Sequence, residues 1–260
     1  MSAEGRDIPR WRRWLLKPAV LPLARAFVVL VCLSLVATDA WLIWKARDVQ
    51  LRDAQIESSN LASALARQAA DSLKKADTVL LDMVERLQVD GTGPAQLQRL
   101  NGLMRQHVFG QAELHGLFAY DRDGNWLVSS FGNIPPGANN AGREYFIFHR
   151  NHPDDHGPHI GLPIRSRTTN QWIIPVSRRL EDAQGGFAGV ALATLSIDYF
   201  QAFYSTFDIR DNGTISLALN NGTLLVRSPF FESSIGSSIV NGPVFKTLLP
   251  QSPVGSSMHA

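Results

Sequence analysis

The residues best suited to hold a small molecule lie where Arg143 stands beside two aromatic side chains, Tyr145 and Phe146. An arginine fork binds a carboxylate through parallel hydrogen bonds, and aromatic walls strengthen such a pair by excluding water. The pattern therefore predicts a pocket for a carboxylate or another small anion. The alternative is that Arg143 pairs only with Glu144 or a loop carbonyl, while Tyr145 and Phe146 belong to the core.

Two further aromatic residues, Tyr120 and Trp172, are candidate pocket walls because each lies at the end of a predicted strand close to this segment. Ordinary core packing is the alternative for both. Arg165 and Arg167 fall in a short polar turn, where charged side chains are usually solvated. We therefore leave these two arginines out of the predicted site.

Imidazoles and carboxylates gather just after the arginine, and both ligand types suit zinc, copper or nickel. Proline and glycine residues interrupt the group, so helical spacing cannot bring two rings together. We expect a solvated loop beside the pocket and no bound metal, and a periplasmic metal-binding protein remains an alternative. The residues concerned are His149, His152, Asp154, Asp155, His156 and His159.

Composition argues against several other classes of function. The net charge is only +2, and six of the 25 basic residues crowd the first 25 positions, which leaves the rest close to neutral, so no nucleic-acid-binding face is expected. The sequence contains no phosphate-binding glycine loop, no Gly-x-Ser-x-Gly elbow and no HExxH motif. We expect no enzyme activity in this chain and no cofactor. Its single cysteine, Cys32, excludes an intrachain disulfide.

The elements that must position the pocket follow an α+β pattern. A short helix is predicted over residues 143–150, and an exit helix over 198–207. Alternating apolar residues and turn signals predict strands joined by short hairpins, the first around Asp121–Asn125. The predicted strands are 114–120, 126–130, 159–164, 172–178 and 187–196.

An apolar run over residues 26–44 is long enough to cross a bilayer as a helix, for which about 20 residues are needed. Basic residues precede the run, which predicts a cytoplasmic N-terminus and places the remainder outside. A cleaved signal peptide is the alternative, but Thr38-Asp39-Ala40 is a poor cleavage site.

Residues 45–89 contain no proline or glycine and predict a long stalk helix, followed by a shorter helix over 95–107. From Leu73 the apolar residues recur at alternating steps of three and four, through Leu80 to Leu87, as in a coiled-coil seam. This spacing predicts a homodimer through the stalk. The alternative is an amphipathic helix that lies along its own domain.

The order of these features resembles a known family. The xxDxxGxxxxSS hairpin, the GREYF helix, the IGxP strand and the WxIPVSRRL and GxFxGVxxATxSxDYF strands follow a membrane helix and a stalk. Over residues 45–230 this looks like the extracytoplasmic double Cache (dCache_1) sensor domain of bacterial transmembrane receptors. It is most similar to sensors that precede diguanylate cyclase (GGDEF) modules. Histidine kinases and chemoreceptors carry similar domains.

The resemblance implies two PAS-like lobes, with the ligand in the membrane-distal one. It divides the chain into a cytoplasmic N-terminus (1–25), a transmembrane helix (26–44), stalk and second helix (45–107), the distal lobe (108–210) and a partial proximal lobe (211–260). Strands over 214–220 and 223–228 fit the start of the proximal lobe, which then stays incomplete. No apolar run that could span a bilayer follows in 242–260.

The resemblance also bears on the ligand. Amino-acid-binding members of the family carry an Arg-x-Trp-Tyr pattern where this chain has Arg143, Tyr145 and Phe146. They hold the ligand's amino group with an aspartate in the last strand, where Thr194 stands here. The expected ligand is therefore a small carboxylate or other anion without an ammonium group, and Thr194 joins the predicted site.

The resemblance implies a sensor that is anchored in the bacterial inner membrane and binds a small molecule in the periplasm. It further implies that this sensor belongs to a receptor whose output is cyclic-di-GMP synthesis. One alternative is the sensor of a histidine kinase or chemoreceptor. Another is an interaction or decoy subunit without output that dimerises with full receptors through the stalk.

Overall fold

A computed structural model describes residues 20–209 and 213–252 of the chain. The predicted cytoplasmic N-terminus up to residue 19, residues 210–212 and the last eight residues lie outside the described part. Two units can be distinguished, one holding residues 1–60 and the other residues 61–255. The pocket residues predicted from the sequence all belong to the second unit.

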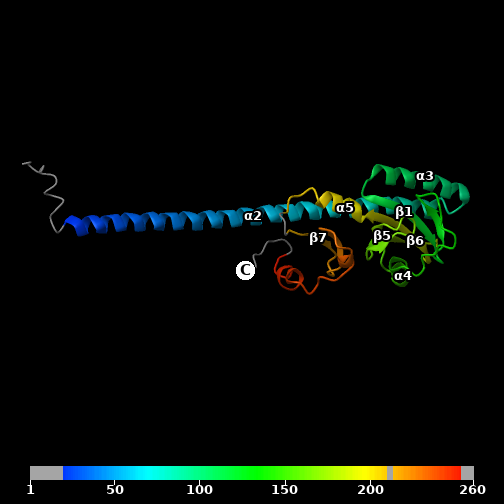
Figure 1. The fold of residues 1–260 in the computed structure, drawn as a ribbon. Helices are drawn as coiled ribbons and strands as arrows, with labels where there is room; N and C mark the ends of the chain where they lie inside the picture. Colours follow the sequence, from blue (N-terminus) through cyan, green and yellow to red (C-terminus); the bar gives the residue numbers. More distant parts are fainter. Residues whose placement is uncertain (1–19, 210–212, 253–260) are drawn as a thin grey trace, which may run out of the picture. The chain divides into compact units, whose positions relative to one another are not determined.

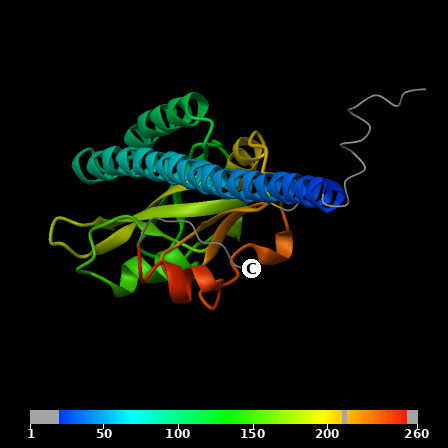
Figure 2. The same ribbon diagram turned by 90° about the vertical axis from the view of Figure 1, so that its left-hand side faces the viewer.

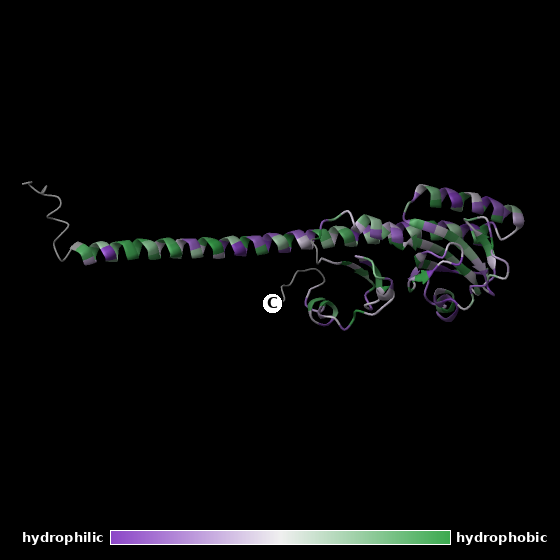
Figure 3. Cartoon of the chain, viewed as in Figure 1, coloured by the Kyte–Doolittle hydropathy of each residue, from purple (hydrophilic) through white to green (hydrophobic). Residues whose placement is uncertain are grey.

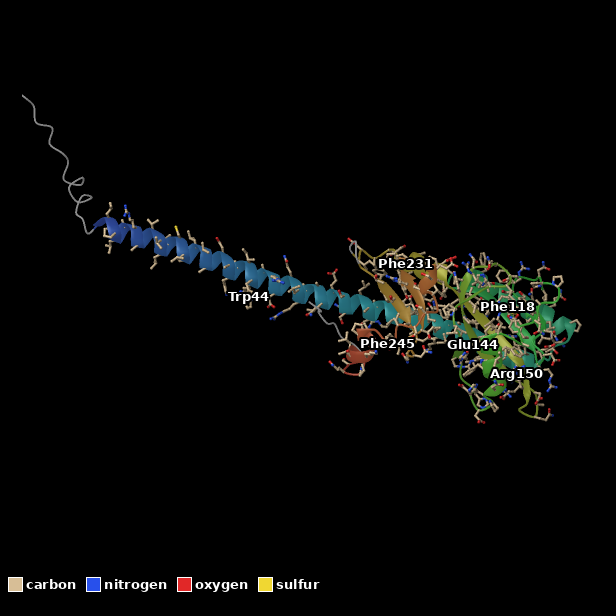
Figure 4. All side chains as sticks on the ribbon, turned by 60° about the horizontal axis from the view of Figure 1, so that its bottom comes forward. Trp44, Phe118, Glu144, Arg150, Phe231 and Phe245 are labelled. Atoms are coloured by element: carbon tan, nitrogen blue, oxygen red, sulfur yellow. The ribbon has the colours of Figure 1, made fainter. Side chains whose placement is uncertain are left out.

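Helix α2 (Val20–Val89) covers the predicted membrane and stalk segments without a break. Its only proline, Pro22, lies in the first turn, where the missing N–H interrupts no hydrogen bond. Residues 21–46 are exposed, and apolar side chains predominate there (Figure 3). Among the described residues, this is the one helix long and apolar enough to cross a membrane. Trp44, labelled in Figure 4, lies at the end of the predicted span.

Six antiparallel strands form the central sheet, in the order β2-β1-β6-β5-β3, with β4 also paired to β5 (Figure 1). Three helices accompany the sheet: α3 (Pro94–Gly110), α4 (Glu144–Asn151) and α5 (Ile197–Tyr204). The strands are β1 (Leu114–Asp121), β2 (Trp126–Ser129), β3 (His159–Ile160), β4 (Ile164–Arg165), β5 (Trp172–Glu181) and β6 (Phe187–Ser196).

Alternation along the strands gives the sheet two apolar faces. On β1, Leu117 and Ala119 belong to the core that includes α2, α3 and α5. Phe118 and Tyr120 point the other way, into a smaller cluster with the aromatic residues of α4. The part of α2 from residue 61 onward and α3 lie together on one side of the sheet (Figure 2). The α+β fold class predicted from the sequence is confirmed.

The apolar seam of the stalk packs against its own domain. Leu80 and Leu87 are buried in the core beneath the sheet, and Leu73 is half-buried against it. The amphipathic-helix alternative is therefore the correct interpretation for these turns. The coiled-coil reading of Leu73, Leu80 and Leu87 is wrong because their side chains already have apolar partners within the chain.

The predicted strand over residues 159–164 is wrong in one respect, since it is split into β3 and β4. Pro175 of β5 lies opposite the break, and its carbonyl accepts a hydrogen bond from Gly161 N at 2.9 Å. Proline has no N–H to return a ladder hydrogen bond on that edge. The chain bulges at residues 161–163 and pairs again at Ile164.

Beyond α5, a second lobe begins with the hairpin of β7 (Ile215–Ala218) and β8 (Leu224–Ser228). Gly222 lies in its turn at φ +83°, a conformation that glycine adopts without strain. The hairpin predicted around Asn220-Asn221-Gly222 is confirmed, with shorter strands. A short 3-10 helix, η1 (Glu232–Ser234), and a π-helical turn, η2 (Val244–Leu248), follow. Phe231 and Phe245 in Figure 4 mark this lobe.

Candidate functional site

A small cavity lies between the sheet and the segments around α4, on the face opposite α2. Its volume is about 20 Å³, roughly the room needed for one water molecule. Basic, aromatic and polar side chains surround it, and no aspartate or glutamate of the described residues lines it. The cavity thus has room for little more than a water molecule, so its walls must separate before a larger ligand can enter.

Four of the six predicted site residues line this cavity: Arg143, Tyr145, Tyr120 and Thr194. Phe146 does not. It is fully buried, and its ring packs edge-on against Phe187 at 5.4 Å between centroids.

Trp172 also stays outside the cavity lining. Its ring lies under the guanidinium of Arg165, at 4.7 Å, and it packs against the core on the α2 side. The structure thus brings together the arginine, the two tyrosines and the threonine, and separates them from the other two aromatic residues.

A buried hydrogen-bond network forms the floor of the cavity. Asn140 Nδ2 donates to the Tyr145 hydroxyl at 2.7 Å, and Trp126 Nε1 donates to Asn140 Oδ1 at 3.3 Å. Burial raises the pKa of Tyr145 and raises that of Tyr120 well above its usual value. Both hydroxyls therefore keep their protons at physiological pH, and since Tyr120 hydrogen-bonds to Tyr145, the Tyr145 hydroxyl is the one left to donate to an anion.

Arg143 precedes the first residue of α4, where its backbone is extended. Its guanidinium makes a long hydrogen bond of 3.4 Å to the carbonyl of Arg165. The loop-carbonyl contact anticipated as an alternative therefore exists, but the pairing with Glu144 does not, because Glu144 binds His159 Nε2 at 2.8 Å.

The loop over residues 165–170 closes the cavity, with Arg165, Ser166, Arg167 and Thr168 among its lining residues. Arg167 Nη1 donates to the carbonyl of Asn139 at 2.8 Å, which ties this loop to the segment before α4. Sequence reasoning missed these residues, and it missed Trp126 and Asn140 as well. For the residues of the loop, the only signal was the polar, arginine-rich turn itself.

Thr194 joins the cavity to β1. Its hydroxyl donates to Gly116 O at 3.0 Å and lies 3.2 Å from His115 Nδ1. The other ring nitrogen of His115 lies 2.7 Å from Thr169 Oγ1, in the covering loop. Burial lowers the pKa of His115, so the neutral ring bridges the sheet and the loop.

The histidines of the predicted loop have separate partners. His149 is fully buried in α4, with Nε2 at 3.0 Å from Ser177 Oγ. His152 Nδ1 lies 2.8 Å from the carbonyl of Phe148, and His156 lies 3.4 Å from Glu181. His159 pairs with Glu144. In the part of the chain that the structure describes, no three His, Cys, Asp or Glu residues are grouped to hold a metal.

Comparison with known proteins identifies the family of this fold. The sequence profile of the Cache domain (dCache_1) matches residues 46–250. The chain belongs to the Cache domain family. This Cache domain is similar to the extracellular domain of rpHK1S-Z16, named as a histidine kinase, at 36% identity and a TM-score of 0.65. The match covers 75% of this chain and 78% of that one.

More distant structures share the fold. The ligand-binding domain of the Pseudomonas aeruginosa PAO1 chemoreceptor PctC, solved with GABA, is 14% identical, with a TM-score of 0.57 over 74% of this Cache domain and 83% of its own chain. That of the Pseudomonas fluorescens chemoreceptor CtaA, solved with L-isoleucine, is 16% identical, with a TM-score of 0.54 over 70% and 71%. A comparison with curated protein sequences finds no significant match.

Proposed function

We propose that this Cache domain is the membrane-anchored periplasmic sensor of a bacterial signal-transduction receptor. Its family consists of extracytoplasmic ligand-sensing domains, and its similarity to a histidine kinase domain supports a receptor role. The exposed apolar part of α2 would hold it in the inner membrane, with the sheet domain outside. Sensing requires only ligand binding, so the chain itself needs no catalytic residue.

The proposed ligand is a small carboxylate or other anion, and the unpaired guanidinium of Arg143 carries this proposal. Arg143 lines the cavity and has no carboxylate partner among the described residues. The protonated hydroxyl of Tyr145, which also lines the cavity, is a further donor beside it. An α-amino acid fits less well because its ammonium group would find no carboxylate on the cavity wall.

A conformational change caused by ligand binding would be transmitted to α2 through the sheet. Arg178 of β5 binds both carboxylate oxygens of Asp77, on the helix that leads towards the predicted membrane segment. A ligand shifts such a coupled system only as far as it binds two states of the lobe unequally. The cavity is too small for such a ligand as it stands, so a ligand-bound lobe would differ from this one in the spacing of the cavity walls.

Two outputs are supported by different observations. The sequence motifs of the strands resemble those of sensors that precede diguanylate cyclases, which favours a cyclase output. The 36% identical relative is named as a histidine kinase, which favours a kinase output. Membranes carrying the receptor, incubated with labelled GTP or ATP, would separate them. Cyclic-di-GMP would support the cyclase, and phosphorylated protein would support the kinase.

Self-association through the helix also stays a proposal. Because Leu80 and Leu87 are buried, we propose that it uses exposed apolar side chains outside this seam, Val49 and Ile56, which are seven residues apart. Sedimentation of the full chain in detergent would show a dimer that Val49→Glu with Ile56→Glu converts to a monomer. A monomeric wild-type protein would exclude this dimer.

A thermal-shift screen of the full chain in detergent tests the sensor function. The panel is acetate, benzoate, succinate, inorganic phosphate, alanine and putrescine. A ligand present at a hundred times its dissociation constant stabilises the native state by about 2.7 kcal/mol. We expect a carboxylate to raise the melting temperature and putrescine to leave it unchanged. Stabilisation by putrescine alone would contradict an anion pocket.

A further inference from the structure

The cavity carries more positive charge than one carboxylate requires. Three arginines line it, Arg143, Arg165 and Arg167, and no acidic side chain of the described residues does. Of the three, only Arg165 has a carboxylate partner among the residues that the structure describes. Its Nη2 lies 2.5 Å from Glu232 Oε1, in the second lobe, and its Nη1 donates to the Asn170 carbonyl at 2.8 Å. Glu232 therefore neutralises Arg165.

The remaining two guanidiniums, of Arg143 and Arg167, have no ion-pair partner among the described residues. Each has a neutral carbonyl instead, Arg165 O for the first and Asn139 O for the second. A carbonyl orients a guanidinium without cancelling its charge, so both remain able to bind an anion. Their carbonyl contacts hold them on the two segments that enclose the cavity, at the start of α4 and in the covering loop.

Both charges act on the same point of the cavity floor. The positive charges of Arg143 and Arg167 each favour ionisation of the Tyr145 hydroxyl, although burial dominates and keeps it protonated. That hydroxyl accepts from Asn140, a residue only 4% exposed. The floor between the two arginines is therefore a fixed, polar surface rather than an apolar one.

From this arrangement we infer that the site selects ligands with two separate anionic groups, one held by Arg143 and the other by Arg167. The inference rests on the proposed sensor function and makes it more specific. An α,ω-dicarboxylate would compensate both guanidiniums, whereas a monocarboxylate leaves one of them without a counter-charge. Arg167 would also draw the covering loop over the bound ligand, since it belongs to that loop.

The test compares dicarboxylates of two to six carbons with monocarboxylates of the same length and with inorganic phosphate. Binding to the full chain in detergent is measured by titration calorimetry at fixed ionic strength. We expect at least one dicarboxylate to bind about 10-fold more tightly than its monocarboxylate. Arg167→Gln should reduce this ratio below about 3-fold and change monocarboxylate affinity little. Arg150→Gln, which removes an exposed charge from α4 (Figure 4), is the matched control and should preserve the ratio.

Three results would overturn the inference while leaving an anion sensor in place. The first is equal affinity for monocarboxylates and dicarboxylates. The second is tighter binding of phosphate than of every dicarboxylate. The third is an equal weakening of both carboxylate classes by Arg167→Gln. Binding of none of these anions to a protein with a cooperative melt would instead reject the anion pocket itself, and the inference with it.

Discussion

Arg178 and Asp77 form a two-point ion pair between the sheet and the long helix. Arg178 Nε lies 2.5 Å from Asp77 Oδ1, and Nη2 lies 3.0 Å from Oδ2. Both side chains are largely shielded from solvent, with 15% and 23% exposed. This pair therefore fixes β5 to α2, the helix that also contains the apolar segment.

Asp77→Asn should lower the free energy of unfolding by about 1–3 kcal/mol, since charged hydrogen bonds in shielded sites contribute that much. Asp82→Asn is the control on the same helix. Its partner Arg86 is four residues away and both side chains are about 40% exposed, so a change of about 0.5 kcal/mol or less is expected. Urea unfolding of the full chain in detergent measures both. Equal losses in the two variants would show that the Asp77 pair is no stronger than a surface pair.

Neighbouring leucines on α2 test how the helix packs. Leu80 is fully buried in the core, whereas Leu81 is 48% exposed. Leu80→Ala should cost about 2–5 kcal/mol of stability, and Leu81→Ala about 0.5 kcal/mol or less. A larger loss of stability in Leu81→Ala than in Leu80→Ala, measured by chemical denaturation, would mean that Leu80 does not pack in the core of its own domain.

Stability should fall at mildly acidic pH because of His149. Burial lowers the pKa of this imidazole to about 4, while the unfolded chain titrates near 6.5. The unfolded state therefore binds more protons between these values, and stability present above pH 6.5 is lost as the pH falls towards 4. The loss from His149 should be about 2 kcal/mol between pH 7.5 and pH 5.

His149→Gln removes this titration and keeps a side chain that can hydrogen-bond to Ser177. The difference in unfolding free energy between pH 7.5 and pH 5 should shrink by about 2 kcal/mol in the variant. An unchanged pH dependence would show that the buried imidazole titrates normally in the folded protein.

Much of the fold could be predicted from the sequence because its signals are local. Alternating residues and turn dipeptides located β1, β2, β6 and the β7–β8 hairpin within a few residues. The split of β3 from β4 was not predictable in this way. It depends on Pro175, which faces that edge only after β5 has paired in register with β6.

The site was predicted less completely than the fold. Arg143 and Tyr145 were recognisable from residue type and spacing, and the structure places both at the cavity. Arg167 was expected to be a solvated turn residue, and it is indeed exposed, but it also lines the cavity. Its place over the cavity follows from the pairing of β4 with β5 and from its contact with Asn139, 28 positions earlier. Such long-range placement leaves no local pattern in the sequence.

The central claim is that Arg143 binds the anion that this sensor detects. Calorimetric titration of the carboxylate with the largest thermal shift, into wild-type protein, Arg143→Gln and Arg150→Gln, tests it most directly. Loss of a buried charge pair costs about 2 kcal/mol or more, so Arg143→Gln should weaken binding at least about 30-fold. Arg150→Gln should bind like the wild type. Wild-type affinity in a folded Arg143→Gln protein would contradict the account.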